Sequence, residues 1–369
     1  MAMPMRSNVS SVVRVFRRSL HGSSASNNGV LSPNTKIAGV FGALMNRGQG
    51  KEGVRDGPNA IREAGLLTLL KDCGISFRDY GDVEIQAIAS DDPWKKVKYS
   101  RTVAGGCKQI ADKVQTIIRE NGVPIMLGGD HASAIGSISG HGLSQLEIHG
   151  IKDPAATAPL AVLWIDAHAD INTPLTTATG NLHGCPVSFL LKEMSPYIPR
   201  DIPGFEWQQP CLTADRIAYI GLRALDPDEL FVMDKLKIKY FPMQDVDKLG
   251  VQKCVELALQ HINPNNDLPL HLSFDIDALD PSVAFSTGTP AMGGLTLREG
   301  LQIVEYVRST GQLSAMDLVE VNPTLGNGYQ RAKTMEAACA IIAGALGKPR
   351  QAIPYKLDFD LPRPSDFSQ

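Results

Sequence analysis

The chain has 369 residues, of which 43% are hydrophobic and 20% charged, and its net charge is −3. This composition is that of a globular protein and excludes intrinsic disorder for most of the chain. No run of about 18 apolar residues occurs, so we expect no membrane insertion. The near-neutral charge gives no electrostatic footprint for a nucleic-acid partner.

The charge is distributed unevenly along the chain, because the first acidic residue is Glu52. Residues 1–35 hold four arginines and eight serines. Drawn as a helix, this stretch gathers valine, phenylalanine and leucine on one side and arginine on the other, which is typical of an organelle transit peptide. We therefore predict a mitochondrial transit peptide or disordered leader over residues 1–30 and a mitochondrial location. If the segment is only a basic tail, the prediction becomes a cytoplasmic location.

Short apolar runs alternate with helical patterns from residue 35 to residue 346. The predicted strands are 37–41, 124–127, 160–165, 217–220, 238–241, 268–274 and 313–319, and the clearest helices are 103–117, 251–262, 296–309 and 332–346. Several strands are apolar without alternation, which favours a parallel sheet buried on both faces. We predict an α/β protein with a single three-layer αβα domain over residues 35–346 and a central, mostly parallel sheet. A proline-rich C-terminal tail is predicted for residues 347–369.

Ionisable residues follow three of the predicted strands directly. The three groups are Asp130 with His131, then Asp166, His168 and Asp170, and finally Asp275, Asp277 and Asp280. In an α/β sheet, ligands bind in the crevice beyond the carboxyl ends of the strands. Residues two apart on an extended chain point the same way, so each group can direct its side chains at one point.

Carboxylates packed this closely repel one another unless cations neutralise them, so the pattern predicts a metal site. The candidate ligands are His131, Asp166, His168, Asp170, Asp275 and Asp277. They are too many for one open catalytic zinc and suit two ions about 3.5–4 Å apart. Oxygen-rich ligation without thiolate suits Mn²⁺, although Co²⁺, Fe²⁺, Ni²⁺ or Zn²⁺ would also bind. The six cysteines have no CxxC spacing and are expected to be reduced thiols. The alternative is that the aspartates only cap helices and solvate loops.

The ordered segments GGDH, DAHADINTP and SFDIDALDP resemble the ureohydrolase family. The segments GKEGVRDGPNAIREAGL, TGNLHGCPVSFLL, TGTPAMGGLTLREG and LVEVNP resemble its arginases, and the basic leader resembles the mitochondrial type. The resemblance runs through almost the whole core. It implies a binuclear manganese hydrolase, with two Mn²⁺ per subunit, that converts L-arginine and water to L-ornithine and urea. It also implies a metal-bridging hydroxide that attacks the guanidinium carbon, and a homotrimer.

The resemblance implies a role for each ligand and for three catalytic residues. One manganese would be held by His131, Asp166, Asp170 and Asp275, and the other by Asp166, His168, Asp275 and Asp277. The catalytic set would be Asp170, His183 and Glu320. As an imidazole with a pKa near about 6.5, His183 would pass a proton to the leaving amine. Glu320 would pair with the planar guanidinium. The alternatives are a histidine bonded within its own loop and an ion pair of Glu320 with a structural arginine.

Substrate contacts are also implied by the resemblance. The α-carboxylate and its surroundings would be bound by Asn172, Thr177, Thr179 and Asn181, and the α-ammonium would face Asp226 with Glu229 as a helper. Neutral donors near an acid suit a zwitterionic amino-acid head, whereas the alternatives are turn residues and a helix N-cap at Asp226. Three positions depart from the family pattern. At Ala132 many relatives have serine, so a hydrogen bond near His131 is expected to be missing. Thr179 replaces a serine and Ala224 replaces an acid, and both changes bear on substrate affinity.

Three other functions fit parts of this pattern. An agmatinase, or another ureohydrolase of guanidino compounds, would share the metal ligands but would not need contacts to an α-amino-acid head. A deacylase of related fold would need a one-zinc site, which the complete ligand set argues against. A catalytically inactive regulatory homologue would usually lack ligands, whereas all six are present here.

Overall fold

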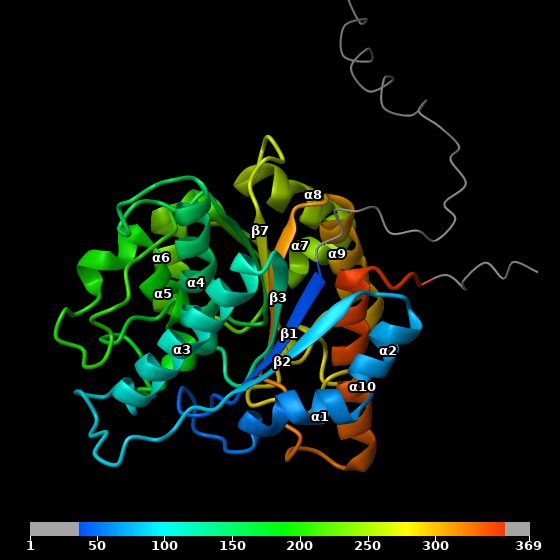
Figure 1. The fold of residues 1–369 in the computed structure, drawn as a ribbon, viewed down its shortest axis with the longest axis horizontal. Helices are drawn as coiled ribbons and strands as arrows, with labels where there is room; N and C mark the ends of the chain where they lie inside the picture. The colour runs from blue at the N-terminus through cyan, green and yellow to red at the C-terminus, as the bar shows by residue number, and fades with distance from the viewer. Residues whose placement is uncertain (1–36, 351–369) are drawn as a thin grey trace, which may run out of the picture. The chain divides into compact units, whose positions relative to one another are not determined.

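A parallel β-sheet of eight strands forms the centre of residues 37–350, the part of the chain that the computed structural model describes (Figure 1). The strands are β1 (Ile37–Ala43), β2 (Phe77–Val83), β3 (Gly122–Leu127), β4 (Ala161–Ile165), β5 (Ile217–Leu222), β6 (Lys239–Pro242), β7 (Leu270–Asp275) and β8 (Leu313–Val319). Their order is β2-β1-β3-β8-β7-β4-β5-β6, and every neighbouring pair is parallel. The predicted α/β class is confirmed. The predicted leader over residues 1–30, and the predicted tail from residue 351 onward, lie outside the described residues.

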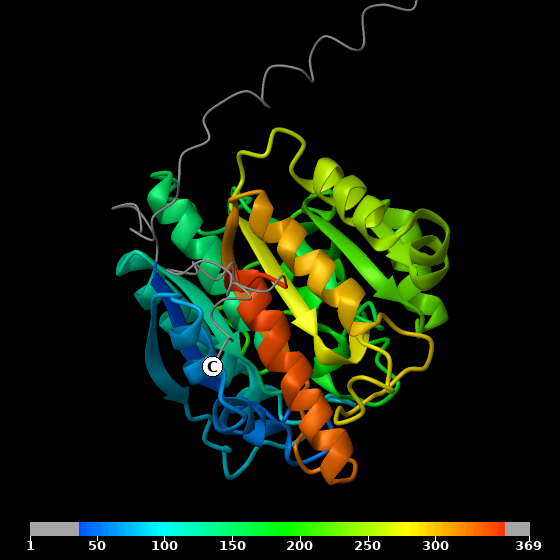
Figure 2. The same cartoon turned by 90° about the vertical axis from the view of Figure 1, so that its right-hand side faces the viewer.

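Helices cover both faces of the sheet. They are α1 (Gly57–Glu63), α2 (Leu66–Asp72), α3 (Ser100–Arg119), α4 (Ser133–Ile148), α5 (Pro186–Leu190), α6 (Pro227–Leu236), α7 (Met243–Leu249), α8 (Val251–Ile262), α9 (Leu297–Ser309) and α10 (Gly328–Leu346). Helices α3–α6 pack on one face and the other six on the opposite face, where Figure 2 shows α9 and α10 side by side. This gives the predicted three layers. Among residues 37–350, no helix has the length and apolar character that crossing a bilayer requires.

Each central strand contributes to a core on both of its faces. In β4, Leu163 and Ile165 pack with α8–α10, whereas Val162 and Trp164 pack on the side of α4 and α5. All four side chains are fully buried. Burial on both faces explains why these strands read as continuous apolar runs rather than as alternating patterns.

The edge strand β2 was missing from the predicted elements, since its sequence FRDYGDV is mostly polar and only its last residue, Val83, is buried. Its acidic residues instead form ion pairs with Arg62 of α1, at 3.0 Å to Asp79 and 2.6 Å to Asp82. An edge strand has one strand neighbour and need not be apolar, so hydrophobic patterning gives no signal for it.

Strand register brings the ends of four central strands into one row. Leu127 of β3 is aligned with Leu318 of β8, Leu318 with Phe274 of β7, and Phe274 with Ile165 of β4. The chain leaves the sheet on the same side just beyond each of these residues, because the strands are parallel. The residues that follow the row therefore meet at one edge of the sheet.

Candidate active site

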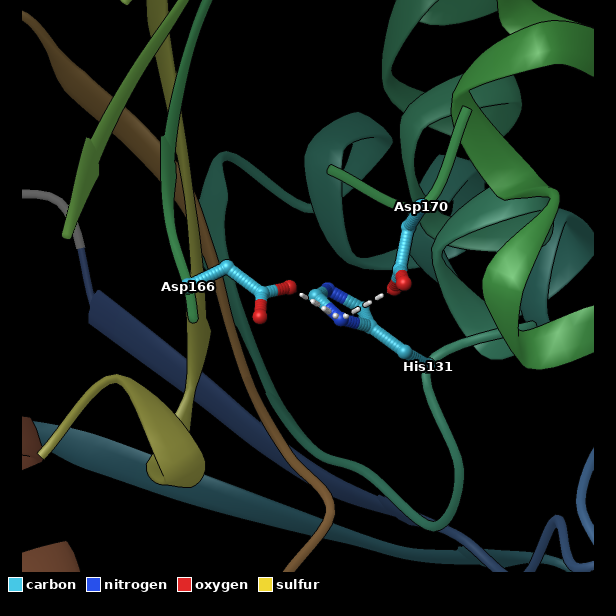
Figure 3. A group of neighbouring side chains, drawn as sticks. All are labelled: His131, Asp166 and Asp170. Atoms are coloured by element: carbon cyan, nitrogen blue, oxygen red, sulfur yellow. Dashed lines mark ion pairs between the residues drawn. The ribbon is translucent and has the colours of Figure 1, made fainter. Parts of the chain in front are cut away.

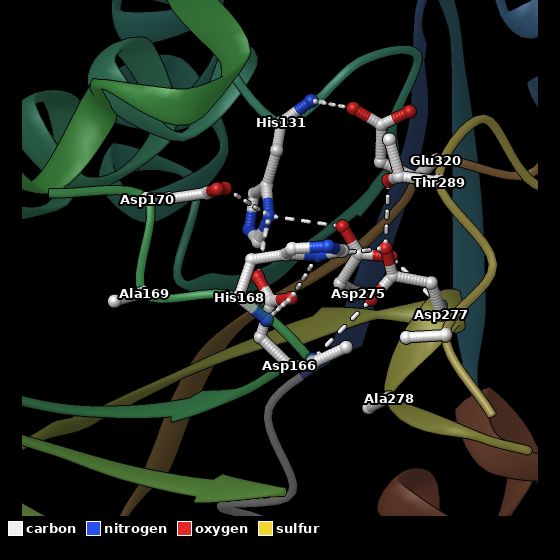
Figure 4. A network of polar contacts seen from close by, with 12 residues as sticks. His131, Asp166, His168, Ala169, Asp170, Asp275, Asp277, Ala278, Thr289 and Glu320 are labelled. Carbon is white, nitrogen blue, oxygen red and sulfur yellow. Dashed lines mark hydrogen bonds and ion pairs between the residues drawn. The ribbon is translucent and has the colours of Figure 1, made fainter. Parts of the chain in front are cut away.

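The row of strand ends delivers every predicted metal ligand to one place (Figure 4). His131 follows β3, the group Asp166, His168 and Asp170 follows β4, Asp275 ends β7, Asp277 lies in the 3-10 helix Ile276–Ala278, and Glu320 follows β8. Asp170 and Glu320 have left-handed backbone conformations, with φ of 50° and 63°. Such angles are uncommon outside glycine and asparagine and are concentrated at functional sites, where surrounding structure enforces them.

The first cluster is centred on the ring of His131 (Figure 3). Its Nδ1 lies 3.1 Å from Asp166 Oδ2, 3.1 Å from Asp170 Oδ2 and 3.2 Å from Asp275 Oδ2. All four residues are buried. Despite these short distances, Nδ1 has no hydrogen-bond partner among residues 37–350. The nitrogen therefore points between three carboxylates.

Two contacts hold this imidazole in place. Nε2 of His131 lies 3.0 Å from Ser273 Oγ, and the ring stacks on Trp164 with centroids 4.2 Å apart. Trp164 also donates from Nε1 to Asp166 Oδ2 at 2.9 Å. A histidine whose Nε2 donates a hydrogen bond presents the lone pair of Nδ1, which is the form that binds a metal. A hydrogen bond near His131 was expected to be missing because residue 132 is alanine. The structure shows a different serine, Ser273, in contact with the ring.

The second cluster shares Asp166 with the first. Nδ1 of His168 lies 3.5 Å from Asp166 Oδ1 and 3.1 Å from Asp277 Oδ2. Thr289 donates a hydrogen bond to Asp277 Oδ2 at 3.0 Å, and Asp275 Oδ1 accepts one from the backbone N–H of Asp277 at 2.8 Å. The two oxygens of Asp166 therefore face different histidines, as a carboxylate that bridges two centres would.

The carboxylates perturb one another's ionisation. Burial and repulsion from Asp277 and Asp166 raise the pKa of Asp275 well above its usual range, and burial and Asp166 raise the pKa of Asp170 to about 6. Burial also favours the neutral form of Asp166, yet His131 and His168 hold its pKa well below the usual range. Burial lowers the pKa of His168, but Asp277 and Asp166 outweigh it and raise that pKa to about 12. The protein alone leaves negative charge here that only protons or cations can balance.

These observations fit a cation in each cluster. An unpaired, buried imidazole nitrogen that faces three carboxylate oxygens has the donor set of a divalent metal site. In each of two groups the ligand atoms lie within 4.8 Å of one another: His131 with Asp166 and Asp170, and Asp166 with His168 and Asp277. The sequence-based prediction that these residues come together is therefore met by the geometry.

His183 and Glu320 form a pair beside the clusters. His183 lies in the 3-10 helix Leu182–Gly184, and its Nδ1 is 3.1 Å from Glu320 Oε1. Burial lowers the pKa of His183, but the Glu320 carboxylate outweighs it and raises that pKa to about 9. This value lies above the ordinary imidazole pKa near about 6.5. With this pKa the imidazole is protonated at neutral pH.

Glu320 is buried, and both of its carboxylate oxygens have partners in the protein. Oε1 also accepts a hydrogen bond from the backbone N–H of His131 at 2.9 Å, and Oε2 accepts one from Gln49 Nε2. Within residues 37–350 the carboxylate thus pairs with an imidazole, a backbone amide and a side-chain amide rather than with an arginine. It does not line the neighbouring cavity itself.

A cavity of about 160 Å³ opens beside the two clusters. Its walls contain His168, Asp170, Asp275, His183 and Thr289 together with all six predicted substrate contacts, which are Asn172, Thr177, Thr179, Asn181, Asp226 and Glu229. The structure therefore brings these residues to one place. A larger cavity of about 470 Å³, lined by residues between Phe189 and Pro210, contains none of the predicted site residues.

Asp226 and Glu229 also have a structural task. Asp226 is the N-cap of α6, and its backbone N–H donates to Glu229 Oε2 at 3.0 Å in a capping box. Glu229 Oε1 accepts from the backbone N–H of Ile171 at 3.2 Å, and Asn172 Nδ2 donates to Asp226 Oδ2 at 3.0 Å. Burial raises the pKa of Glu229 to about 7. The capping alternative for Asp226 is thus correct, and the cap also borders the cavity.

Several partners of the predicted residues were missed by sequence reasoning. Trp164 and Ser273 stand two residues before Asp166 and Asp275, so the alternation of a strand places each on the same face as its aspartate. The sequence therefore contained a signal for both Trp164 and Ser273. Thr289 lies in the TGTP segment, whose chemistry the sequence does not specify. Gln49 lies 271 positions before Glu320 and carried no local signal.

A parallel α/β sheet that ends in two carboxylate–imidazole clusters, next to a cavity bordered by His183, has the arrangement that a metal-dependent hydrolase requires. Comparison with known proteins identifies the kind. The profile described as Arginase family matches residues 36–347. Human arginase-1 is 45% identical over 330 residues, which are 89% of this chain and 98% of that protein. Human mitochondrial arginase-2 is 44% identical over 339 residues, or 91% and 92% of the two chains.

Among solved structures, the arginase from Bacillus caldovelox is similar with a TM-score of 0.74 and 30% identity, covering 86% of this chain and 100% of its own. The chain belongs to the arginase family. This confirms the resemblance on which the expectations rested, and with it the interpretation of the chain as an arginase-type hydrolase.

Proposed function

We propose that this protein is a binuclear manganese enzyme that hydrolyses L-arginine to L-ornithine and urea. One observation carries the proposal: two ligand clusters that share Asp166 border the same cavity as the residues suited to an amino-acid head. The name arginase, which the human relatives carry, supports this choice of substrate.

Two manganese ions would be held by the ligand sets implied by the family. The first set is His131, Asp166, Asp170 and Asp275, and the second is Asp166, His168, Asp275 and Asp277. When bound, two divalent cations lower the pKa of water and so provide a hydroxide nucleophile at neutral pH. Metal analysis by mass spectrometry of the purified protein tests the number of ions. Two per chain would support the proposal, and one would contradict it.

The protein's own residues would bind the guanidinium and deliver the proton. The Glu320 carboxylate would face the planar guanidinium cation, which its two oxygens suit in shape and charge. As the bond between the guanidinium carbon and the δ-nitrogen breaks, His183 would donate its proton to that nitrogen, and L-ornithine leaves as the amine. The water oxygen becomes the carbonyl oxygen of urea. Asp170 both joins the first ligand set and borders the cavity, so it would connect metal binding with the substrate.

The amino-acid head of the substrate would lie at the outer wall of the cavity. Asn172, Thr177, Thr179 and Asn181 would donate hydrogen bonds to the α-carboxylate. The acid of Asp226, which Glu229 holds through the capping box, would face the α-ammonium. The methyl group of Thr179 and the absence of an acid at Ala224 change the shape and charge of this wall, so they bear on affinity rather than on the chemistry.

A urea-release assay on manganese-loaded protein with L-arginine and agmatine tests the substrate. Agmatine keeps the guanidinium and lacks the α-carboxylate, so we expect urea from L-arginine at a much higher kcat/KM. Urea from agmatine alone would make the protein an agmatinase. If both ions are bound and neither compound yields urea, a catalytically inactive regulatory homologue would be the better description.

We also propose a homotrimer, as the family resemblance implies. Light scattering on the purified protein measures its molar mass in solution. A mass near three times 39.8 kDa is expected, and a monomer or dimer mass would contradict it.

A mitochondrial location is proposed from the acid-free, arginine-rich segment over residues 1–30. The relative named mitochondrial arginase-2 supports it. Fusion of this segment to a fluorescent protein should direct the fusion to mitochondria, and a diffuse cytoplasmic signal would favour the basic-tail alternative. The extended C-terminal tail over residues 347–369 remains a prediction.

A further inference from the structure

The loop that follows β1, residues 44–53, contacts several of the loops that build the site. The carbonyl of Met45 accepts a hydrogen bond from the backbone N–H of Asp130 at 3.0 Å, and Gly48 N–H donates to Asp130 Oδ2 at 2.8 Å. The backbone N–H of His183 donates to the Gly48 carbonyl at 2.9 Å. A Cβ at Gly48 would lie 2.2 Å from Asp130 Oδ1, so this close approach requires glycine.

Gln49 extends from this loop toward Glu320. The side chain is 6% exposed, and its Nε2 donates to Glu320 Oε2. Its Oε1 accepts from the backbone N–H of Lys51 at 3.2 Å. A carboxylate can only accept and a backbone N–H can only donate, so the two partners determine the orientation of the amide. On a third side the amide touches Gly288, where a Cβ would lie 3.0 Å from Oε1.

Among residues 37–350, no other donor to the Glu320 carboxylate lies on this side. Oε1 is engaged by the His131 N–H and the His183 ring, whereas the donor to Oε2 is Gln49. A neutral amide orients a carboxylate without cancelling its charge, which a lysine or arginine at the same place would do. The one donor to Oε2 among the described residues is thus a neutral amide, and Oε2 keeps a lone pair for a further donor.

We propose that Gln49 is a positioning residue, which holds the Glu320 carboxylate in the orientation that receives the substrate guanidinium. This inference rests on the proposed function, since it takes Glu320 to be the guanidinium partner. Gln49 itself touches neither the cavity nor any ligand side chain. Its effect is expected on guanidinium recognition rather than on metal binding.

The test compares Gln49→Met with Gln208→Met in the manganese-loaded protein. Methionine preserves the length of the side chain and removes the donor. Gln208 is a matched control, because it is 9% exposed and donates Nε2 to the Phe189 carbonyl at 2.8 Å, away from the ligands. L-Ornithine, measured as a competitive inhibitor, has the same amino-acid head as L-arginine but no guanidinium.

For Gln49→Met we expect kcat/KM for L-arginine to fall about 10- to 100-fold, the effect of losing a hydrogen bond to a charged group. The inhibition constant of L-ornithine and the metal content should stay at wild-type values, and Gln208→Met should match wild type throughout. A second variant, Gln49→Asn, keeps the amide but is one methylene too short to reach Glu320, so it should show the same pattern.

A fall of less than about threefold in both Gln49 variants would overturn the proposal. So would a parallel weakening of L-ornithine inhibition or loss of metal, which a merely structural role predicts. If the wild-type protein releases urea from agmatine alone, the proposed function fails. The Gln49 variants are then compared with agmatine as the substrate and putrescine as the inhibitor. This comparison still tests Gln49, since its role does not depend on the amino-acid head.

Discussion

Replacing Ser273 by alanine tests whether the His131 ring is a metal ligand held in one tautomer. Both side chains are fully buried, and Ser273 Oγ lies 3.0 Å from His131 Nε2. When Nδ1 faces a cation, Nε2 carries the proton, and alanine would leave that N–H without its partner. An unpaired buried donor costs about 1–3 kcal/mol, so Mn²⁺ affinity should fall about 5- to 150-fold. Stacking on Trp164, at 4.2 Å, keeps the ring in place and limits the loss.

Isothermal titration calorimetry of Mn²⁺ into metal-free protein measures this affinity. Ser144→Ala is the control, because Ser144 is also buried but donates to the Gly140 carbonyl at 2.9 Å inside α4. The weakening is expected for one of the two ions, the one that His131 binds. Wild-type affinity for both ions in Ser273→Ala, or an equal loss in Ser144→Ala, would refute the reasoning.

Three further variants test other parts of the structure. His183→Ala should keep its metals by mass spectrometry while kcat falls about 100-fold or more, as for loss of a general acid, and loss of metal would instead make His183 a ligand. Glu229→Gln tests pH dependence. Burial raises the pKa of Glu229 to about 7, so the folded state favours the neutral carboxyl. The stability that this neutral form adds is fully present below about pH 4.5 and is lost as the pH rises through about 7. In urea denaturation, the free energy of unfolding should therefore decline less between about pH 4.5 and 7 in Glu229→Gln than in the wild-type protein. The same decline in both proteins would contradict the raised pKa. Asp317→Ala removes a buried contact of 2.9 Å to His271 Nε2, so the free energy of unfolding should fall by about 1–3 kcal/mol; wild-type stability in denaturant would show that the contact contributes little.

Hydrophobic patterning predicted the helices and strands that are buried through apolar side chains. It missed helix α4, which packs against its neighbour through glycines. This helix lies against α3 through Gly136 and Gly140, where a Cβ would come within 2.3 and 2.5 Å of the carbonyl oxygens of Cys107 and Ala111. Helices that approach this closely are buried through their backbones, so their sequences lack the periodic apolar stripe on which prediction relies.

The candidate site was predictable to the extent that its residues follow strands. Asp166 and Asp275 lie at strand ends, as predicted. The extended geometry assumed for the residues two positions further on does not hold, because the chain has left the strands there: Asp170 has a left-handed backbone with φ of 50°, and Asp277 lies in a 3-10 helix. The Gln49–Glu320 contact depends instead on how the loop after β1, early in the chain, folds over the end of β8, which comes much later in the sequence. No local pattern encodes such a contact, and the pKa of His183 depends on Glu320 in the same way.

The position of β8 in the sheet has a consequence for biosynthesis. This strand is the last one in residues 37–350, yet it lies between β3 and β7, with β2-β1-β3 on one side and β7-β4-β5-β6 on the other. His131 belongs to the first group of strands, whereas Asp166 and Asp275 belong to the second. Until residues 313–319 have left the ribosome, no strand connects the two groups, and long-range pairings of this kind form late. A nascent chain therefore acquires its complete metal centre only near the end of its synthesis.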